Sequence, residues 1–125
     1  MFDDSKPIFQ QLAERLIDDI LRGRYAEGDQ VPSTNELAAY LRINPATAGK
    51  GLGLLVEQGI LVKRRGIGMF VAEGATASIA AERREHFIKD FIRPLLTEAR
   101  TIGIDRNELI RLLSDDHNTG QPHQD

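Results

Sequence analysis

Residues 44–53 read NPATAGKGLG and lie where the flanking sequence predicts a helix. The stretch holds Gly49, Gly51 and Gly53, and each glycine costs about 1 kcal/mol relative to alanine inside a helix. Either the segment is a glycine-rich loop that cradles a phosphate, or it is a helix that uses the missing side chains. The choice between the two restricts both the fold and the function of the chain.

The helix is favoured because Asn44 can cap it and Pro45 suits its first position, where the missing N–H costs nothing. Successive helical residues rotate by about 100°, so the segment has two distinct faces. The apolar face holds Gly51 with Ala48, Leu52, Leu55 and Val56, and the opposite face holds Ala46, Gly49, Lys50 and Gly53. We expect Gly51 to let a neighbouring helix pack closely, and the bare opposite face to let the backbone approach a large ligand surface. Glycines that serve helix packing alone remain the alternative.

The phosphate-loop interpretation fits poorly. In the pattern GxxxxGK[ST], Asn44 stands where the first glycine belongs, and Gly51 stands where Ser or Thr should follow Lys50. No strand signal precedes the segment either.

Two more helices are predicted before this segment. Residues 7–22 carry apolar residues at helical spacing, and Gly23 suits the C-terminal end of that helix. After the loop AEGDQVPS, Ser33 and Glu36 form a capping box that opens a short helix ending at Leu41. RIN then forms a tight turn into the glycine-containing helix.

After Gly59 the pattern changes to that of strands. The runs 60–63 and 69–72 are β-prone, and the basic, glycine-rich segment RRGIG between them predicts a hairpin. Helix, short helix, turn, helix and basic hairpin is the order of a winged helix-turn-helix, whose helix after the turn enters the DNA major groove. A solvated hairpin with incidental arginines is the alternative for this segment.

The charge distribution favours a polyanionic partner that touches one face. The whole chain has a net charge of −3, yet residues 42–65 contain five cations and one anion. The cations are Arg42, Lys50, Lys63, Arg64 and Arg65, and the anion is Glu57. The negative net charge argues against a protein that coats nucleic acid nonspecifically, whereas a local basic patch suits a polyanionic partner that is contacted on one face only.

The last third of the chain predicts a helical tail. Residues 78–100 have a broad apolar face interrupted at Pro94, where a kink or break is expected, and a second helix restarts at Asp105 after Gly103. Two helices cannot bury such faces by themselves, so we expect a twofold partner, with folding back onto the winged helix as the alternative. The segment HNTGQPHQD, residues 117–125, is polar and is predicted to be disordered.

The motifs PIFQQ, ILRGRYAEGDQVPS, ELAAYL, INPATA and LVEQGILVKRRGIGMFV, in this order without insertions, resemble the winged-helix domain of the GntR family of bacterial transcription regulators. The short tail is similar to that of the YtrA subfamily. The resemblance implies a mainly α fold with a small β-hairpin, in which residues 1–74 form a winged helix-turn-helix DNA-binding domain and residues 75–116 a helical dimerisation tail.

The resemblance also implies positions for the DNA contacts. They are Ser33, Thr34, Asn35, Asn44, Ala46, Thr47, Lys50, Arg64, Arg65, Gly66 and Gly68. Asn35 and Lys50 stand where the family often has arginine, which leaves the base preference at those positions open, and Ser33 and Asn44 could serve only as caps. Dimer contacts are expected from Phe87, Phe91, Leu95 and Leu109.

These observations predict a cytoplasmic, homodimeric repressor of transcription that binds an inverted-repeat, double-stranded DNA operator and no membrane. Many members of the family that this chain resembles respond to a small molecule, which suggests an effector whose identity the sequence leaves open. A winged helix used only for protein contacts is the alternative. No enzyme, metal or cofactor is expected, because the chain has no cysteine and no credible Ser, His, Asp set. Of His86, His117 and His123, only His117 has carboxylates nearby in sequence, in a loose cluster with Asp115 and Asp116 that is better explained as solvated surface.

Overall fold

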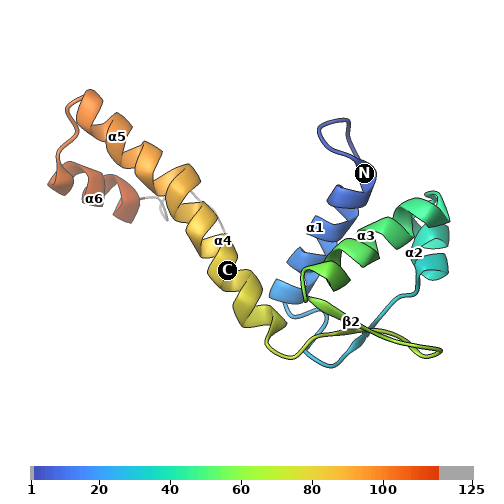
Figure 1. Ribbon diagram of the computed structural model, residues 1–125. Coiled ribbons are helices and arrows are strands. Elements are labelled where there is room, and N and C mark those ends of the chain that lie inside the picture. Colours follow the sequence, from blue (N-terminus) through green and yellow to red (C-terminus); the bar gives the residue numbers. More distant parts are fainter. Residues whose placement is uncertain (1, 116–125) are drawn as a thin grey trace. The chain divides into compact units, whose positions relative to one another are not determined.

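The computed structural model describes residues 2–115, which divide into two compact units between Glu82 and Arg83. The N-terminal unit contains the helices α1 (Ile8–Leu21), α2 (Thr34–Leu41) and α3 (Pro45–Glu57) and a small sheet (Figure 1). The predicted disorder of residues 117–125 lies outside the described residues.

The core of the N-terminal unit forms where α3 packs against both α1 and α2. Its most completely buried side chains are Leu12, Ile20, Leu52, Leu55 and Leu61. The apolar positions of α1 and α3 that the helical spacing predicts therefore do face the core, and the fold is the expected winged helix-turn-helix.

Gly51 lies where α3 meets α1. A Cβ atom at this position would lie 2.9 Å from Cδ2 of Leu12 and 3.0 Å from the carbonyl oxygen of Phe9. Only glycine allows the two helix backbones to approach this closely without a shift. The prediction that Gly51 permits close helix packing is confirmed.

The sheet has three strands, one more than the predicted hairpin. Strands β2 (Leu61–Arg64) and β3 (Gly68–Val71) pair antiparallel, each lying one residue closer to the turn than expected. Strand β1 (Gln30–Val31) pairs with the other edge of β3, with Gln30 opposite Phe70 and Val31 opposite Met69. The sequence predicts only a loop for the segment that contains β1, because two residues cannot show an alternating pattern.

The helix that follows the sheet begins before the expected Ser78. Helix α4 (Ala75–Phe87) contributes Ala75 and Ile79 to the core of the N-terminal unit, so that this unit extends to Glu82. The carboxylate of Glu27 accepts hydrogen bonds from the backbone N–H of Gly74, at 2.8 Å, and of Thr76, at 3.3 Å. Glu27 thus caps the start of α4 from a distant loop.

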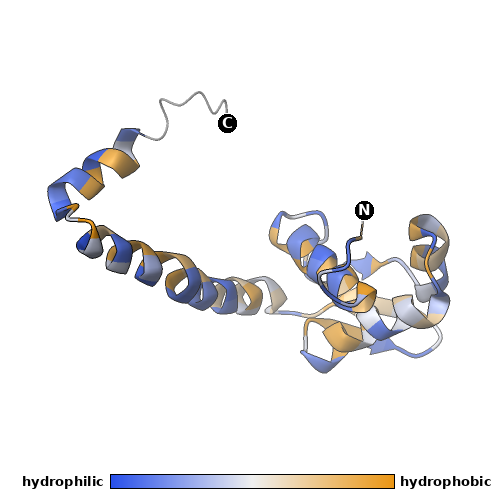
Figure 2. Cartoon of the chain, turned by 90° about the horizontal axis from the view of Figure 1, so that it is seen from above, coloured by the Kyte–Doolittle hydropathy of each residue, from blue (hydrophilic) through white to orange (hydrophobic). Residues whose placement is uncertain are grey.

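The C-terminal unit is helical. A π-helical segment, η1 (Ile88–Ile92), and α5 (Arg93–Thr101) continue directly from α4, and α6 (Arg106–Ser114) follows a turn at Gly103. Pro94 does not break the helix: its missing N–H falls just after the π-helical turn, a common way for a helix to absorb such a defect. Apolar and polar residues alternate along these helices (Figure 2). Within residues 2–115, no helix is both long and apolar enough to cross a membrane.

Candidate nucleic-acid interface

The first predicted contact region is the N-terminus of α2. The Ser33 hydroxyl accepts a hydrogen bond from the backbone N–H of Glu36, at 3.1 Å, and the Glu36 carboxylate accepts one from the N–H of Ser33, at 2.8 Å. This is the predicted capping box, so Ser33 has a structural role whatever else it contacts. Asn35 is exposed beside it, and Thr34 is half-buried against α3.

The second region is the N-terminus of α3. The Asn44 side chain accepts a hydrogen bond of 2.8 Å from the N–H of Ala46, and Pro45 occupies the first turn. Asn44 is therefore also a cap. Ala46 is exposed and Thr47 is half-buried in the first turn, at the end of α3 that has free backbone N–H groups.

The outer face of α3 carries little side-chain bulk, as predicted. A Cβ atom at Gly53 would meet nothing within 4 Å, and one at Gly49 would make an ordinary contact of 3.6 Å with the Thr34 methyl group. Glycine is thus not required by packing at either position, in contrast to Gly51. This difference removes helix packing as the explanation for Gly49 and Gly53.

Lys50 lies on this outer face, with its ammonium group 4.3 Å from the centre of the Phe9 ring. A cation over an aromatic ring is attracted to it, at about 0.5–1 kcal/mol where the pair is exposed. The pairing holds Lys50 beside the N-terminal turn of α1 and leaves its charge in solvent. Sequence reasoning places Lys50 correctly on the face but cannot foresee this contact between two helices.

The wing is the third region. At its tip, Arg64 and Gly68 face each other across the strands, with Arg65, Gly66 and Ile67 in the turn. The guanidinium of Arg64 lies 4.7 Å from the centre of the Phe70 ring, so it is held along the sheet, and Arg65 is exposed at the tip. Gly66 has a φ of 75°, which the turn requires.

Gly68 has a φ of 145°, which favours glycine, and its missing side chain also leaves room for the Gln30 side chain. The Gln30 side chain crosses it to donate a hydrogen bond of 3.0 Å to the carbonyl oxygen of Ile67, and a Cβ atom at Gly68 would collide with the Gln30 amide. A side chain at position 68 would have to displace the end of the Gln30 side chain, and Gln30 is a supporting residue of the wing that sequence reasoning misses. Nothing in the local sequence indicates it, because the contact depends on the unexpected strand β1.

The cations of the basic patch form no ion pairs within the described residues. No carboxylate lies within ion-pair distance of Arg42, Lys50, Lys63, Arg64 or Arg65 in the part of the chain that the structure describes. The acidic residues of α1 are paired with other cations, for example Glu14 with Lys6 at 2.8 Å and Asp18 with Arg22 at 2.8 Å. The five cations are thus available to an external anion.

The four apolar residues expected at the dimer interface are partly or largely exposed within one chain. The side chains of Phe87 and Phe91 are 52% and 65% exposed, with their rings 6.0 Å apart, and Leu95 and Leu109 are half-buried. Among residues 2–115 there is no group of three or more metal-ligating side chains.

Comparison with known proteins finds relatives that are transcriptional regulators. Residues 8–71 match the family model described as bacterial regulatory proteins, gntR family. The transcriptional repressor YtrA of Bacillus subtilis is 30% identical over 84% of this chain and 80% of its own. A GntR family transcriptional regulator from Listeria monocytogenes superposes with a TM-score of 0.76 at 29% identity, over 91% of this chain and 98% of that one.

One solved relative contains DNA. The DNA-binding domain of AraR, in complex with operator ORX1, is 30% identical and has a TM-score of 0.54, over 58% of this chain and 93% of that chain. The relatives are named as transcriptional regulators and not as enzymes, as the sequence predicts. From the family match, the three-stranded winged fold and the basic face together, we conclude that the chain belongs to the GntR family of bacterial regulatory proteins, as a YtrA-like transcriptional regulator with a DNA-binding domain.

Proposed function

We propose that the protein is a homodimeric repressor that binds an inverted-repeat operator in the cytoplasm and is released by a small-molecule effector. The observation that carries the DNA-binding part is the set of cations on α3 and the wing that form no ion pair within the described residues. In this arrangement α3 enters the major groove, where Ala46, Thr47 and Lys50 meet base edges, and the wing tip reaches the adjacent backbone.

The bare outer face of α3 serves this approach. Gly49 and Gly53 leave room for the groove wall, and the exposed N–H groups at the starts of α2 and α3 suit phosphate oxygens. A winged helix used only for protein contacts would present an apolar or acidic face here. The cations and the AraR operator complex favour DNA.

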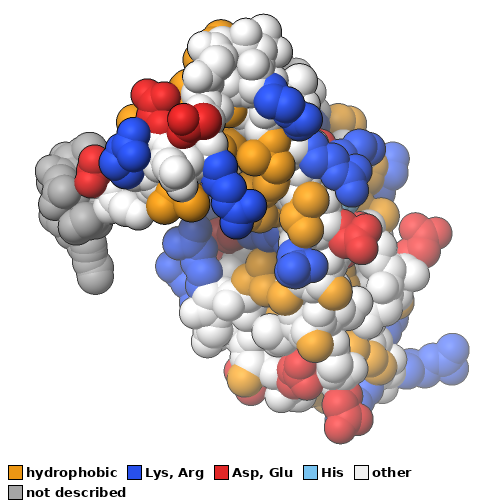
Figure 3. All heavy atoms as spheres, turned by 90° about the vertical axis from the view of Figure 1, so that its left-hand side faces the viewer, with side chains coloured by type: hydrophobic (Ala, Val, Ile, Leu, Met, Phe, Trp, Pro, Cys, Tyr) orange, Lys and Arg blue, Asp and Glu red, His pale blue; other side chains and the backbone are white. Residues whose placement is uncertain are grey.

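The proposed dimer rests on the tail. Apolar side chains of α4 to α6 remain exposed within one chain, and Figure 3 shows such side chains at the surface between charged ones. A second copy would cover them. Two winged-helix domains that are linked in a dimer bind two half-sites with an affinity that one domain cannot reach, because binding of the second half-site becomes intramolecular. Half-sites one helical turn apart would be separated by about 34–36 Å.

The DNA face can be tested by replacing Lys50, Arg64 and Arg65 together with alanine. The operator fragment would be obtained by genome-wide footprinting with the purified protein. We expect much weaker operator binding, and a log–log salt dependence whose slope is lower by about 0.9 for each phosphate that the variant no longer neutralises. The measurement is a set of binding curves at two or more salt concentrations.

The matched control is the triple replacement of Lys6, Arg22 and Arg24 by alanine. These exposed cations belong to the same unit and pair with carboxylates of α1, so the change removes the same charge away from the proposed interface. Equal loss of affinity in both triple variants, or unchanged affinity in the first, would contradict the assignment of the DNA face.

A further inference from the structure

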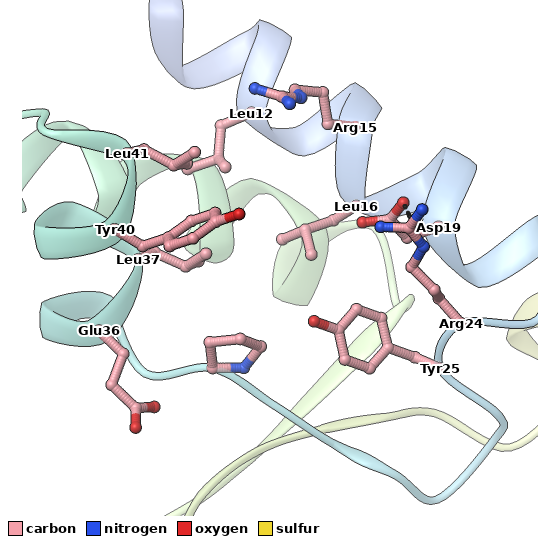
Figure 4. A pocket seen from close by; sticks show the side chains of 11 residues that line it. Leu12, Arg15, Leu16, Asp19, Arg24, Tyr25, Glu36, Leu37, Tyr40 and Leu41 are labelled. Atoms are coloured by element: carbon pink, nitrogen blue, oxygen red, sulfur yellow. Dashed lines mark ion pairs between the residues drawn. The ribbon is translucent and has the colours of Figure 1, made fainter.

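A pocket of about 520 Å³ lies between α1, α2 and the loop that leads to β1 (Figure 4). Its floor is apolar and comes from Leu12, Leu16, Leu37 and Leu41, with Pro32 at one side. This volume and an apolar floor are typical of sites for small organic molecules. None of the residues proposed to contact DNA lines the pocket, so its role is separate from operator binding.

Two tyrosines form the walls. Figure 4 shows the hydroxyl groups of Tyr25 and Tyr40 both pointing into the space between α1 and α2. Neither hydroxyl has a hydrogen-bond partner among the described residues, and Tyr40 is 82% exposed. Aromatic rings favour contact with a second ring, by about 0.5–1.5 kcal/mol beyond the area that is buried. The walls therefore suit a flat aromatic ligand.

The rim carries two cations, Arg15 and Arg24, and two carboxylates, Asp19 and Glu36. Asp19 pairs with Arg24 at 3.7 Å, and the Glu36 carboxylate is used by the Ser33 N–H at 2.8 Å. Arg15 lies with its guanidinium carbon 5.3 Å from the centre of the Phe2 ring and has no carboxylate within ion-pair distance in residues 2–115. Although the charges of the rim balance, Arg15 is its cation without an ion-pair partner among residues 2–115, so its guanidinium is the rim group with which a ligand carboxylate would pair.

We propose that this pocket binds a small aromatic carboxylate. The ring lies over the leucine floor between Tyr25 and Tyr40, the carboxylate meets the guanidinium of Arg15, and the tyrosine hydroxyls are available to polar groups on the ring. The site requires neither DNA nor a second subunit, so it stands independently of the proposed repressor function.

The experiment titrates the full chain, without DNA, with 2-naphthoate and with its neutral analogue 2-naphthamide, and follows amide chemical shifts by NMR. We expect saturable shifts in α1, α2 and residues 24–32, with the carboxylate bound roughly fivefold more tightly than the amide because it gains one ion pair. Arg15→Gln should abolish this preference, and Tyr40→Ala should weaken both ligands by about tenfold.

Arg106→Gln, which removes an exposed arginine of α6, is the matched control and should leave both affinities unchanged. The proposal is overturned if neither compound binds at millimolar concentration, or if Arg15→Gln and Tyr40→Ala bind both compounds as the unaltered chain does. Because no DNA is present, a failure of operator binding would not affect either result.

Discussion

At the scale of single residues, the three glycines of α3 have different roles. We predict that Gly51→Ala lowers the free energy of unfolding by about 1–3 kcal/mol, because the added methyl group would press on Leu12 and on the Phe9 carbonyl. Gly53→Ala is the matched control, since its methyl group meets open space. Chemical denaturation of both variants would measure the difference, and equal stabilities would contradict the packing role of Gly51.

Gly49 and Gly53 are predicted to act on binding instead of folding. Alanine at either position should stabilise the protein by up to about 1 kcal/mol, since alanine is the better helix former and has room at both sites. Operator affinity should nevertheless fall, because the methyl group would stand between α3 and the DNA. Thermal melts combined with binding curves test this, and normal binding by Gly49→Ala would remove the close-approach argument.

The residues that the sequence identifies correctly are those whose roles are local. Ser33 and Asn44 are predictable as caps because a cap is defined by neighbours within three positions. The ring contacts of Lys50 with Phe9 and of Arg64 with Phe70 are not predictable. They depend on how separate elements pack, which residue types and spacing do not reveal.

At the scale of elements, Glu27 connects a loop to the first turn of α4. The N–H groups of Gly74 and Thr76 donate to its carboxylate and hold its pKa below the usual value. The folded state thus prefers the ionised form, and the stabilisation is complete above the pKa of the unfolded chain, about 4.3. It is lost as the pH falls through the lower pKa of the folded protein.

We therefore predict that Glu27→Gln lowers the melting temperature at neutral pH, and that the difference from the unaltered chain shrinks as the pH falls below about 4. Glu73→Gln removes a nearby exposed carboxylate and should have little effect at any pH. Melting curves between neutral and acidic pH measure both. A Glu27→Gln deficit that persists undiminished at the lowest pH would show that the charge is not what matters.

Strand β1 and the unbroken helix at Pro94 are two of the features that differ from expectation. Strand β1 has only two residues and exists because β3 offers it a free edge, and the helix passes Pro94 because a π-helical turn precedes it. Helix ends with capping residues are predicted well, as at Asp105, whose side chain accepts from the N–H of Glu108. The pairing of the short strand β1 depends on a partner that is distant along the chain, which a single sequence does not display.

At the scale of the whole molecule, we predict that a chain shortened to end at Glu82 folds but is monomeric. The end at Glu82 keeps Ala75 and Ile79, which belong to the core, whereas an end at Glu73 would remove them. Operator affinity should fall steeply because the two winged-helix domains are no longer linked. Sedimentation measures the oligomeric state, and a shortened chain that remains dimeric would place the interface in the winged helix.

The full-length counterpart is Phe91→Asp, which should also give a monomer because the interface would bury an unpaired charge. Its winged helix should keep its stability, since Phe91 lies in the C-terminal unit. Arg93→Gln, at an exposed neighbouring position, lowers the charge by the same one unit and is the control. A dimer that survives Phe91→Asp would exclude this aromatic pair from the interface.

The pairing of β1 with β3 also affects how the protein folds. Gln30 and Phe70 are 40 positions apart, and Leu12 and Gly51, where α1 meets α3, are 39 positions apart, so both contacts close a long stretch of chain at a cost in entropy. Strand β1 has only two residues to offset that cost, so we expect it to pair after α1 and α3 have packed, with a low φ-value at Val31. Strand β1, which pairs with the edge of β3 opposite to β2, would then be the last part of the winged helix to become native.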